Sequence, residues 1–236
     1  MNEFLRLHGH LRDAEICRAL IDHLHISYST DGEYRLPADP RVIISCNHPL
    51  GGLDGIILID LFTRHYGRRV RVLVNDLLMA VEPLGGVFLP INKHGHQSRE
   101  ASRAIDEAFS GDDPIIMFPA GLVSRKGKKG AIADLTWQKT FINKAIRYRR
   151  DIIPAHFSGT NSKFFYNFAK FRALLGIKLN IEMVRLPREM FLSEGRSYRI
   201  SIGDPINWQS LRGGTAASDE AMRLRSITYG LVSGRK

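Results

Sequence analysis

Short apolar runs of strand length alternate with amphipathic stretches along most of this 236-residue chain. The runs are rich in β-branched residues, which favour strands, and six stand out: VIISC (42–46), VRVLV (70–74), PIIMF (114–118), DIIPAHF (151–157), LNIEMV (179–184) and YRISIG (198–203). The stretches among them predict helices at residues 54–66, 97–109, 134–147, 164–175 and 218–232, the last with Ser218 as its expected N-cap. Such alternation predicts an α/β fold with a central mixed, largely parallel sheet flanked by helices. In such sheets the chemistry usually lies where strands end in loops at one edge.

The first 25 residues carry one apolar stripe at helical spacing, and it predicts an N-terminal amphipathic helix. Its members are Phe4, Leu7, Leu11, Ala14, Cys17, Ile21 and Leu24. The opposite face is acidic, whereas membrane-surface helices are usually rich in Lys and Arg, so we expect the stripe to pack on the protein core rather than on a membrane. The length suits one globular unit, divided into a helix with its connecting segment (1–40) and a main domain (41–236).

Composition excludes several classes of protein. Cys17 and Cys46 are the only cysteines, too few for a disulfide framework or a four-cysteine zinc site, and there is no clustered acidic metal site. No charge-free stretch approaches the ~20 apolar residues that a spanning helix requires. Charges also interrupt the N-terminus too often for a signal peptide. We therefore expect a cytoplasmic protein without a bound metal.

The net charge of +10 favours a negative partner, such as nucleic acid, an anionic membrane surface or a phosphorylated substrate. The excess is local, because residues 125–150 contain nine Lys or Arg and a single acid, Asp134. This basic run is not interleaved with aromatics that could stack on bases, and the chain has no recognisable nucleic-acid motif. Nucleic acid is therefore the least favoured of the three partners.

The segment NHPLGGLDG (47–55) directly follows the strand predicted at 42–46 and holds the first candidate site. His48 can accept a proton from an alcohol, and Asp54 can orient its ring and stabilise the imidazolium. A continuous helix would rotate the two side chains off a common face, so they meet only through a bend, which Gly51 and Gly52 permit. The alternative is a polar loop in which His48 bonds backbone and Asp54 caps the next helix.

A second candidate is FPAGLVSR (118–125), which follows another predicted strand and leads into KGKKG (126–130). Such a turn can present backbone N–H groups and cations to phosphate oxygens, although a solvated basic loop has the same composition. The segments GGVFLPINK (85–93) and IIPAHFSG (152–159) each indicate a strand followed by a turn. Cys46 is a minor candidate nucleophile, because it lies two residues before His48.

Taken in order, these four segments resemble the four blocks of the phospholipid and glycerol acyltransferase family, whose best-known members acylate lysophosphatidic acid. NHPLGGLD resembles the catalytic Asn-His-x-x-x-x-Asp block, GGVFLPINK the second, FPAGLVSR the third and IIPAHFSG the fourth. The resemblance spans about residues 41–205 and implies a glycerol-3-phosphate acyltransferase-like fold. The HPLGGLDG form with FPAG is similar to a bacterial branch related to acyltransferases of amino-acid lipids, whose acceptor is a hydroxylated acyl-amino acid.

The resemblance implies that His48 is the general base, that Asp54 orients it, and that backbone N–H groups near Gly121 or the Gly51–Gly52 turn stabilise the oxyanion. It implies substrate contacts at Asn47, Gly51, Gly52, Asn92, Lys93, Pro119, Gly121, Ser124, Arg125 and Lys126. The acyl donor would be a thioester of acyl carrier protein or coenzyme A, a co-substrate rather than a cofactor. The expected location is the inner face of a membrane, as a peripheral protein.

The chain departs from the family pattern at three places. Five residues separate His48 from Asp54 where the pattern has four, Ala120 replaces a Glu, and Asn92-Lys93 stands where an Arg serves the acceptor phosphate. Two other functions remain open, the first on the basic charge of the chain and the second on Ala120. One is a non-catalytic basic module for anionic membrane or nucleic acid, and the other is a degenerate family member that binds lipid without turnover.

Overall fold

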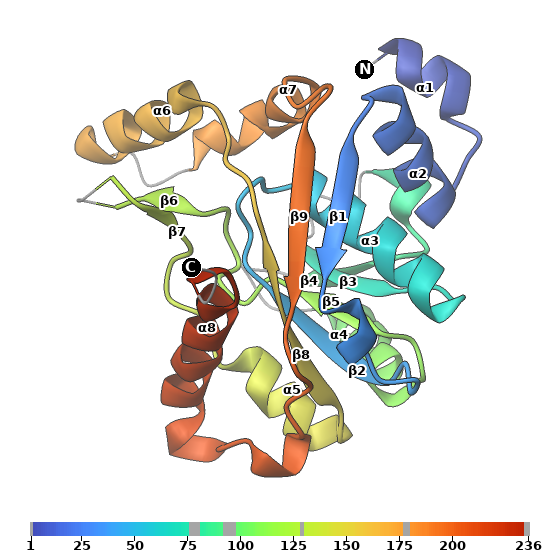
Figure 1. Ribbon diagram of the computed structural model, residues 1–236, viewed down its shortest axis with the longest axis vertical. Coiled ribbons are helices and arrows are strands. Elements are labelled where there is room, and N and C mark those ends of the chain that lie inside the picture. The colour runs from blue at the N-terminus through green and yellow to red at the C-terminus, as the bar shows by residue number, and fades with distance from the viewer. Residues whose placement is uncertain (1, 76–80, 92–97, 128–129, 177–179, 234–236) are drawn as a thin grey trace.

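The computed structural model describes residues 2–75, 81–91, 98–127, 130–176 and 180–233. Seven of the described strands form one sheet (Figure 1). They are β1 (Ser27–Asp31), β2 (Val42–Cys46), β3 (Arg71–Asn75), β4 (Phe88–Ile91), β5 (Ile115–Met117), β8 (Asp151–Phe157) and β9 (Ser197–Ile202). Their order across the sheet is β1-β9-β8-β2-β5-β3-β4, and every neighbouring pair is parallel except β8 with β9. The sheet is therefore mixed and largely parallel, as the sequence predicts.

Strand β2 lies at the centre of the sheet, between β8 and β5. Its last residue, Cys46, is level with Ala155 of β8, and the preceding Ser45 is level with Met117 of β5. The segments that follow these three parallel strands therefore leave the sheet at one edge, where ligand sites of α/β sheets usually lie.

Alternate residues of the central strands face two separate cores, so the fold has three layers. On β2, Val42, Ile44 and Cys46 belong to one apolar cluster and Ile43 to the other. The first core is covered by α1 (Asn2–His8), α2 (Asp13–His23) and α3 (Leu53–Tyr66), and the second by α4 (Arg99–Ser110), α5 (Thr140–Tyr148) and α8 (Ala217–Ser233). Burial on both faces explains why these strands are continuous apolar runs rather than alternating ones.

A smaller group of elements packs beside the carboxyl edge of the sheet. It contains the hairpin β6 (Arg125–Lys126) with β7 (Ile132–Ala133), helix α6 (Lys163–Leu174), the 3₁₀ helix η4 (Ile181–Arg185) and α7 (Leu186–Phe191). Val123, Phe165 and Tyr166 form its buried apolar cluster. The remaining short 3₁₀ helices are η1 (Glu33–Arg35), η3 (Glu82–Leu84), η5 (Trp208–Ser210) and η6 (Gly214–Ala216).

The N-terminal apolar stripe packs largely on the protein core, as its acidic opposite face predicts. Phe4, Cys17, Ile21 and Leu24 are buried in the first core, whereas Leu7 is 45% exposed. The predicted single helix is instead two helices, α1 and α2. No helix in the described ranges is long and apolar enough to cross a membrane.

Three element predictions were wrong. The strand expected at 179–184 is instead the 3₁₀ helix η4 from Ile181, because the run does not join the sheet core: Val184 is 82% exposed, while Glu182 is buried in ion pairs with Arg125 and Arg172. The helix expected from Asp134 starts only at Thr140, because the Asp134 carboxylate bonds groups of the candidate site instead. Ser218 lies inside α8 rather than capping it.

Candidate functional site

His48 and Asp54 meet at the carboxyl end of β2. His48 Nδ1 lies 3.0 Å from Asp54 Oδ2; the Asp54 side chain is fully buried, while 15% of the His48 side chain is exposed. Asp54 belongs to the first turn of α3, so the carboxylate also sits where the helix dipole favours negative charge. A buried carboxylate on one ring nitrogen fixes the tautomer and orientation of the imidazole, which is the arrangement of a base and its orienting group.

Asp54 stays ionised because its charge is well compensated. Burial would raise the pKa of Asp54, but the charge and hydrogen bond of His48 and the backbone N–H groups of Leu50 and Gly55 lower it below its ordinary value. The N–H of Leu50 donates to Oδ2 at 2.9 Å and that of Gly55 to Oδ1 at 2.9 Å. The polar-loop alternative, in which His48 and Asp54 act apart, does not describe this geometry.

Gly51 makes the bend that the longer His48–Asp54 spacing requires. Its φ is +77°, in the left-handed region, and a Cβ there would lie 2.8 Å from Leu186 Cδ1. The adjacent Gly52 is the N-cap residue of α3, with φ −170° and ψ −59°, and a Cβ at that position would meet no atom within 4 Å. The N–H of Gly51 donates to Asp54 Oδ2 at 3.3 Å, so this expected oxyanion donor is already used inside the loop.

The third sequence segment packs directly on His48. The ring of Phe118 stacks on the imidazole, with centroids 3.9 Å apart and planes inclined by 26°. Gly121 has φ +68° and closes a turn in which its N–H donates to the Phe118 carbonyl at 2.8 Å, so this second expected oxyanion donor is also engaged. Pro119 is buried, and its carbonyl accepts the N–H of Gln138. The Ser124 N–H donates to the His48 carbonyl at 2.8 Å and joins the two segments.

Asp134 holds the backbone of His48, a role that the sequence analysis missed. Its Oδ1 accepts the His48 N–H at 3.1 Å and the Ser124 hydroxyl at 2.5 Å, and its Oδ2 accepts Trp137 Nε1–H at 2.9 Å. Its own backbone N–H donates to the Tyr229 hydroxyl at 2.8 Å. The available signal was its position as the one acid in a basic run of the sequence.

Asn47 connects the first segment to the fourth. Its side-chain amide donates to the Phe157 carbonyl at 3.0 Å and accepts the Phe157 N–H at 2.7 Å. These two bonds extend the hydrogen bonding between β2 and β8 by one pair. Asn47 is 3% exposed, which places it in the framework of the site rather than on its open side. Burial, reinforced by the charges of Asp54 and Asp134, raises the pKa of the Cys46 thiol well above its ordinary value, so Cys46 is a poor nucleophile.

Among the described residues, the cations of the basic run at 125–150 divide into buried and exposed ones. Arg125 is largely buried in an ion pair with Glu182, and burial lowers its pKa. Arg150 is fully buried, and Lys144 pairs with Asp106. Lys126, on β6, is exposed. Two guanidinium groups of the run, those of Arg125 and Arg150, therefore serve the fold by binding a carboxylate and carbonyls, whereas Lys139, Arg147 and Arg149 are exposed like Lys126.

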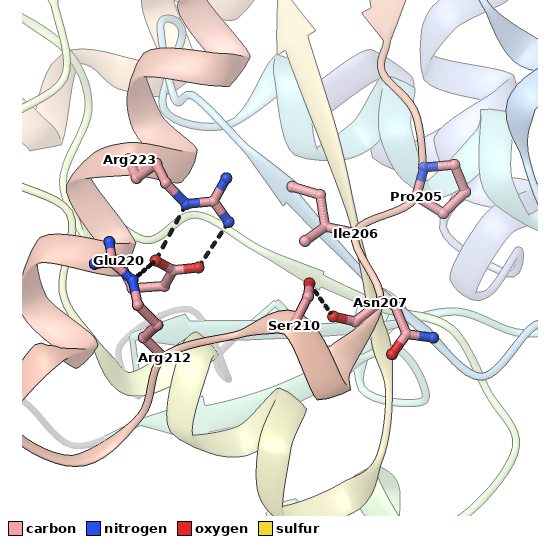
Figure 2. A pocket seen from close by; sticks show the side chains of 7 residues that line it. All are labelled: Pro205, Ile206, Asn207, Ser210, Arg212, Glu220 and Arg223. Carbon is pink, nitrogen blue, oxygen red and sulfur yellow. Dashed lines mark hydrogen bonds and ion pairs between the residues drawn. The ribbon is translucent and has the colours of Figure 1, made fainter.

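Asn92 and Lys93 lie outside the described residues. A hollow of about 560 Å³ lies between η5 and α8, where Arg212 and Arg223 both bond Glu220 (Figure 2). It contains none of the candidate residues. Its Ile206 pairs with Ile152 at the start of β8, whereas Phe157, next to Asn47, ends that strand. The hollow thus lies at the other end of β8 from His48.

Comparison with known proteins gives concordant results. A family model described as "Acyltransferase" matches residues 1–234. Two curated relatives named "Lyso-glycine lipid O-acyltransferase", from Phocaeicola vulgatus and Bacteroides thetaiotaomicron, are each 39% identical over 231 residues. These alignments cover 98% of this chain and 82% and 85% of the two relatives.

A solved structure supports the fold. The 1-acyl-sn-glycerophosphate (LPA) acyltransferase PlsC from Thermotoga maritima matches with a TM-score of 0.53 at 13% identity, covering 100% of this chain and 89% of that one. At this identity the likeness concerns the fold alone.

Proposed function

Because the chain belongs to the acyltransferase family and is an acyltransferase, we propose that it moves a fatty acyl chain from an acyl thioester to the hydroxyl of a lyso-lipid, with His48 as general base. The observation that carries the mechanism is the bond of His48 Nδ1 to the buried, ionised Asp54. With Nδ1–H donating to the carboxylate, the Nε2 atom is the one that accepts a proton.

The proposed reaction has two steps. His48 Nε2 takes the proton of the acceptor hydroxyl as its oxygen attacks the thioester carbonyl carbon, and Asp54 stabilises the imidazolium. The tetrahedral intermediate then collapses, the carbon–sulfur bond breaks, and the thiolate leaves and takes the proton from His48. A thiolate needs little help from an acid, so this chemistry requires no metal or bound cofactor.

The oxyanion of the intermediate needs a donor, which typically contributes about 3–4 kcal/mol. Since the N–H groups of Gly51 and Gly121 donate within their own turns, we place the oxyanion at the open side of the first loop, next to Gly52. The Cα of Gly52 faces open space, which leaves room for the carbonyl of the thioester.

The acceptor that we propose is an acyl-amino acid with a hydroxyl group, as the names of the two relatives suggest. Such an acceptor carries a carboxylate, and Lys126 offers an exposed cation two residues after Ser124. We propose acyl carrier protein or coenzyme A as the carrier of the donor chain. Because the proposed acceptor is a lipid, we propose that the protein acts at the inner face of a membrane, to which it is attached peripherally.

The test is transfer by the purified chain from a labelled acyl thioester, offered on coenzyme A or on acyl carrier protein, to lyso-glycine lipid and to lysophosphatidic acid. His48→Ala and Asp54→Asn should each lower the rate by about 100- to 10,000-fold. His65→Ala is the matched control, because His65 Nδ1 also contacts a carboxylate, Glu33 Oε1 at 3.3 Å, away from the loop. Full transfer by His48→Ala would contradict the mechanism, and absence of transfer to any acceptor by the wild type would favour a lipid-binding or membrane-binding module.

A further inference from the structure

Helix α6 is apolar on two faces. Its inner face packs in the protein, since Phe165, Tyr166 and Ala169 are buried. A second stripe at spacings of four and three residues, hereafter the outer stripe, consists of Phe164, Phe168, Phe171, Leu174 and Leu175. Phe164, Phe171, Leu174 and Leu175 are 53%, 58%, 83% and 58% exposed, and Phe164 stacks on Phe168 at 5.9 Å. Several large apolar side chains exposed along one face of a helix are the kind of surface that marks an interaction site.

The charges around the outer stripe are positive. The guanidinium of Arg185 lies over the Phe164 ring at 4.3 Å. Lys163 and Lys170 of α6 itself are exposed, as are Lys126 on β6, which contacts α6, and Arg188 on α7, which contacts η4. The acids of described residues 160–192 do not offset these charges, because Glu182 is buried against Arg125 and Arg172, and Glu189 is buried against Ser162. Aromatic and aliphatic side chains bordered by Lys and Arg are the composition of helices that lie in the interface of an anionic bilayer.

Helix α6 is tied to the loop that carries His48. The Asn161 side-chain amide, just before the helix, donates to the carbonyls of Pro49 and Leu50 at 3.3 Å each. The Tyr166 hydroxyl donates to the Pro49 carbonyl at 3.4 Å. Figure 1 shows α6 at one margin of the molecule, and contacts join it to β6 and η4. A surface held by the outer stripe would therefore lie next to the candidate site.

We propose that the outer stripe of α6, with its bordering cations, docks on a bilayer that contains anionic lipids and thereby brings the His48 loop to acceptors within that bilayer. The second half of this statement rests on the proposed function. The N-terminal helix is a weaker candidate, because its Phe4 is buried in the core and Leu5 and Leu7 are each only 45% exposed. An acidic carrier protein would complement the charge of these cations, but it would leave the two exposed phenylalanines and two exposed leucines in water.

The binding experiment uses the full chain and vesicles of phosphatidylcholine with phosphatidylglycerol that contain neither acceptor nor thioester. The wild type should float with these vesicles. The triple variant Phe164→Gln/Phe171→Gln/Leu174→Gln should partition at least about tenfold less, because glutamine keeps helix propensity but removes the apolar surface. The control Leu5→Gln/Leu7→Gln changes comparable exposed side chains of α1 and should bind like the wild type. Circular dichroism and thermal unfolding check that all variants keep the fold.

Several outcomes would overturn the docking proposal: no flotation of the wild type, equal flotation of the triple variant, or greater loss in the α1 control. It is also overturned if gel filtration shows a wild-type dimer that the triple variant abolishes, or if the triple variant loses only binding to acyl carrier protein. His48→Ala should still float, so a failure of the proposed chemistry leaves this result intact. With a water-soluble short-chain acceptor the triple variant should keep the wild-type rate, and it should slow only on acceptor embedded in vesicles.

Discussion

Gly51 and Gly52 differ in how much side chain their positions tolerate. At Gly51 an alanine would take φ +77° and place its Cβ 2.8 Å from Leu186 Cδ1 and 3.1 Å from Val123 Cβ, whereas at Gly52 a Cβ meets open space. We expect Gly51→Ala to lower the free energy of unfolding by about 1–3 kcal/mol and to slow acyl transfer, because it shifts the turn that delivers two N–H groups to Asp54. Gly52→Ala should change stability by less than about 0.5 kcal/mol. Urea unfolding measures both variants, and equal losses would contradict this account of the bend.

Asp134 positions His48 through the backbone rather than through the ring. Asp134→Asn replaces one carboxylate oxygen by an amide NH₂ group, so at least one of three donors loses its acceptor: the His48 N–H, the Ser124 hydroxyl or Trp137 Nε1–H. We expect kcat to fall about 10- to 100-fold with little change in KM for the thioester. Asp151→Asn is the matched control, because Asp151 also accepts a backbone N–H, that of Trp208 at 2.9 Å. Asp151 begins β8, at the end of that strand away from His48. Steady-state kinetics on the two folded variants separates these cases, and a change confined to KM would argue against a positioning role.

The lowered pKa of Asp54 gives a pH dependence with a definite sign. Burial raises the pKa of Asp54, but His48 and the backbone N–H groups lower it by more than burial raises it, so the net shift is downward. An acid with a lowered folded-state pKa stabilises the protein above its ordinary pKa and loses that contribution as pH falls through the folded value. We expect Asp54→Asn to cost about 1–3 kcal/mol at neutral pH and the cost to shrink below about pH 4. Unfolding by urea from pH 7 to pH 3 measures it, and a pH-independent cost would refute the assignment.

At the scale of elements, the central strands could be predicted because they are buried on both faces and their sequences are apolar throughout. β8 spans Asp151–Phe157, the predicted range, and β2 likewise matches Val42–Cys46. β1 could not be predicted in this way. Its sequence, SYSTD, is polar, and it becomes a strand only by pairing with β9, about 170 residues later in the chain. Local periodicity contains no information about such a partner.

In the candidate site too, local sequence patterns predict some residues, whereas contacts between distant segments decide the others. His48 and Asp54 could be predicted from residue type and spacing, because the bend between them needs glycine and the chain supplies it. The role of Asp134 could not, because its contacts with His48 and Ser124 depend on how the segment after β7 folds back to the end of β2. The burial of Arg125 and Arg150 could not be predicted for a related reason, since a sequence does not reveal which arginines of a basic run are enclosed by the fold.

Arg150 shows what a buried member of that run does for the elements around it. Its side chain is fully buried and donates to the carbonyls of Ala108 and Phe109 in the last turn of α4, of Gly111 and Asp113 after that helix, and of Val42 at the start of β2. Burial lowers the pKa of Arg150 to about 10, and the residue remains charged at neutral pH. We expect Arg150→Met to destabilise the protein by about 3–5 kcal/mol, because several carbonyls lose their donor.

Arg147→Met is the control for this change, because the Arg147 side chain is 65% exposed and lies 3.8 Å from Asp106. Its effect should stay below about 0.5–1 kcal/mol. Denaturant unfolding at neutral pH compares the two variants. Similar losses would mean that the buried hydrogen bonds of Arg150 contribute little beyond its charge.

For the whole molecule, the first forty residues contribute to the same sheet and core as the rest. β1 pairs in parallel with β9 along five residue pairs, and the buried Cys17, Ile21 and Leu24 belong to the core that covers one face of β2. Removing residues 1–40 would expose that apolar face and the edge of β9, which creates an unpaired strand edge prone to aggregation. We therefore expect the intact chain to unfold in one calorimetric transition, and the fragment 41–236 to be insoluble or to lack a cooperative transition. A soluble fragment with the melting temperature of the intact chain would instead show that the main domain is stable on its own.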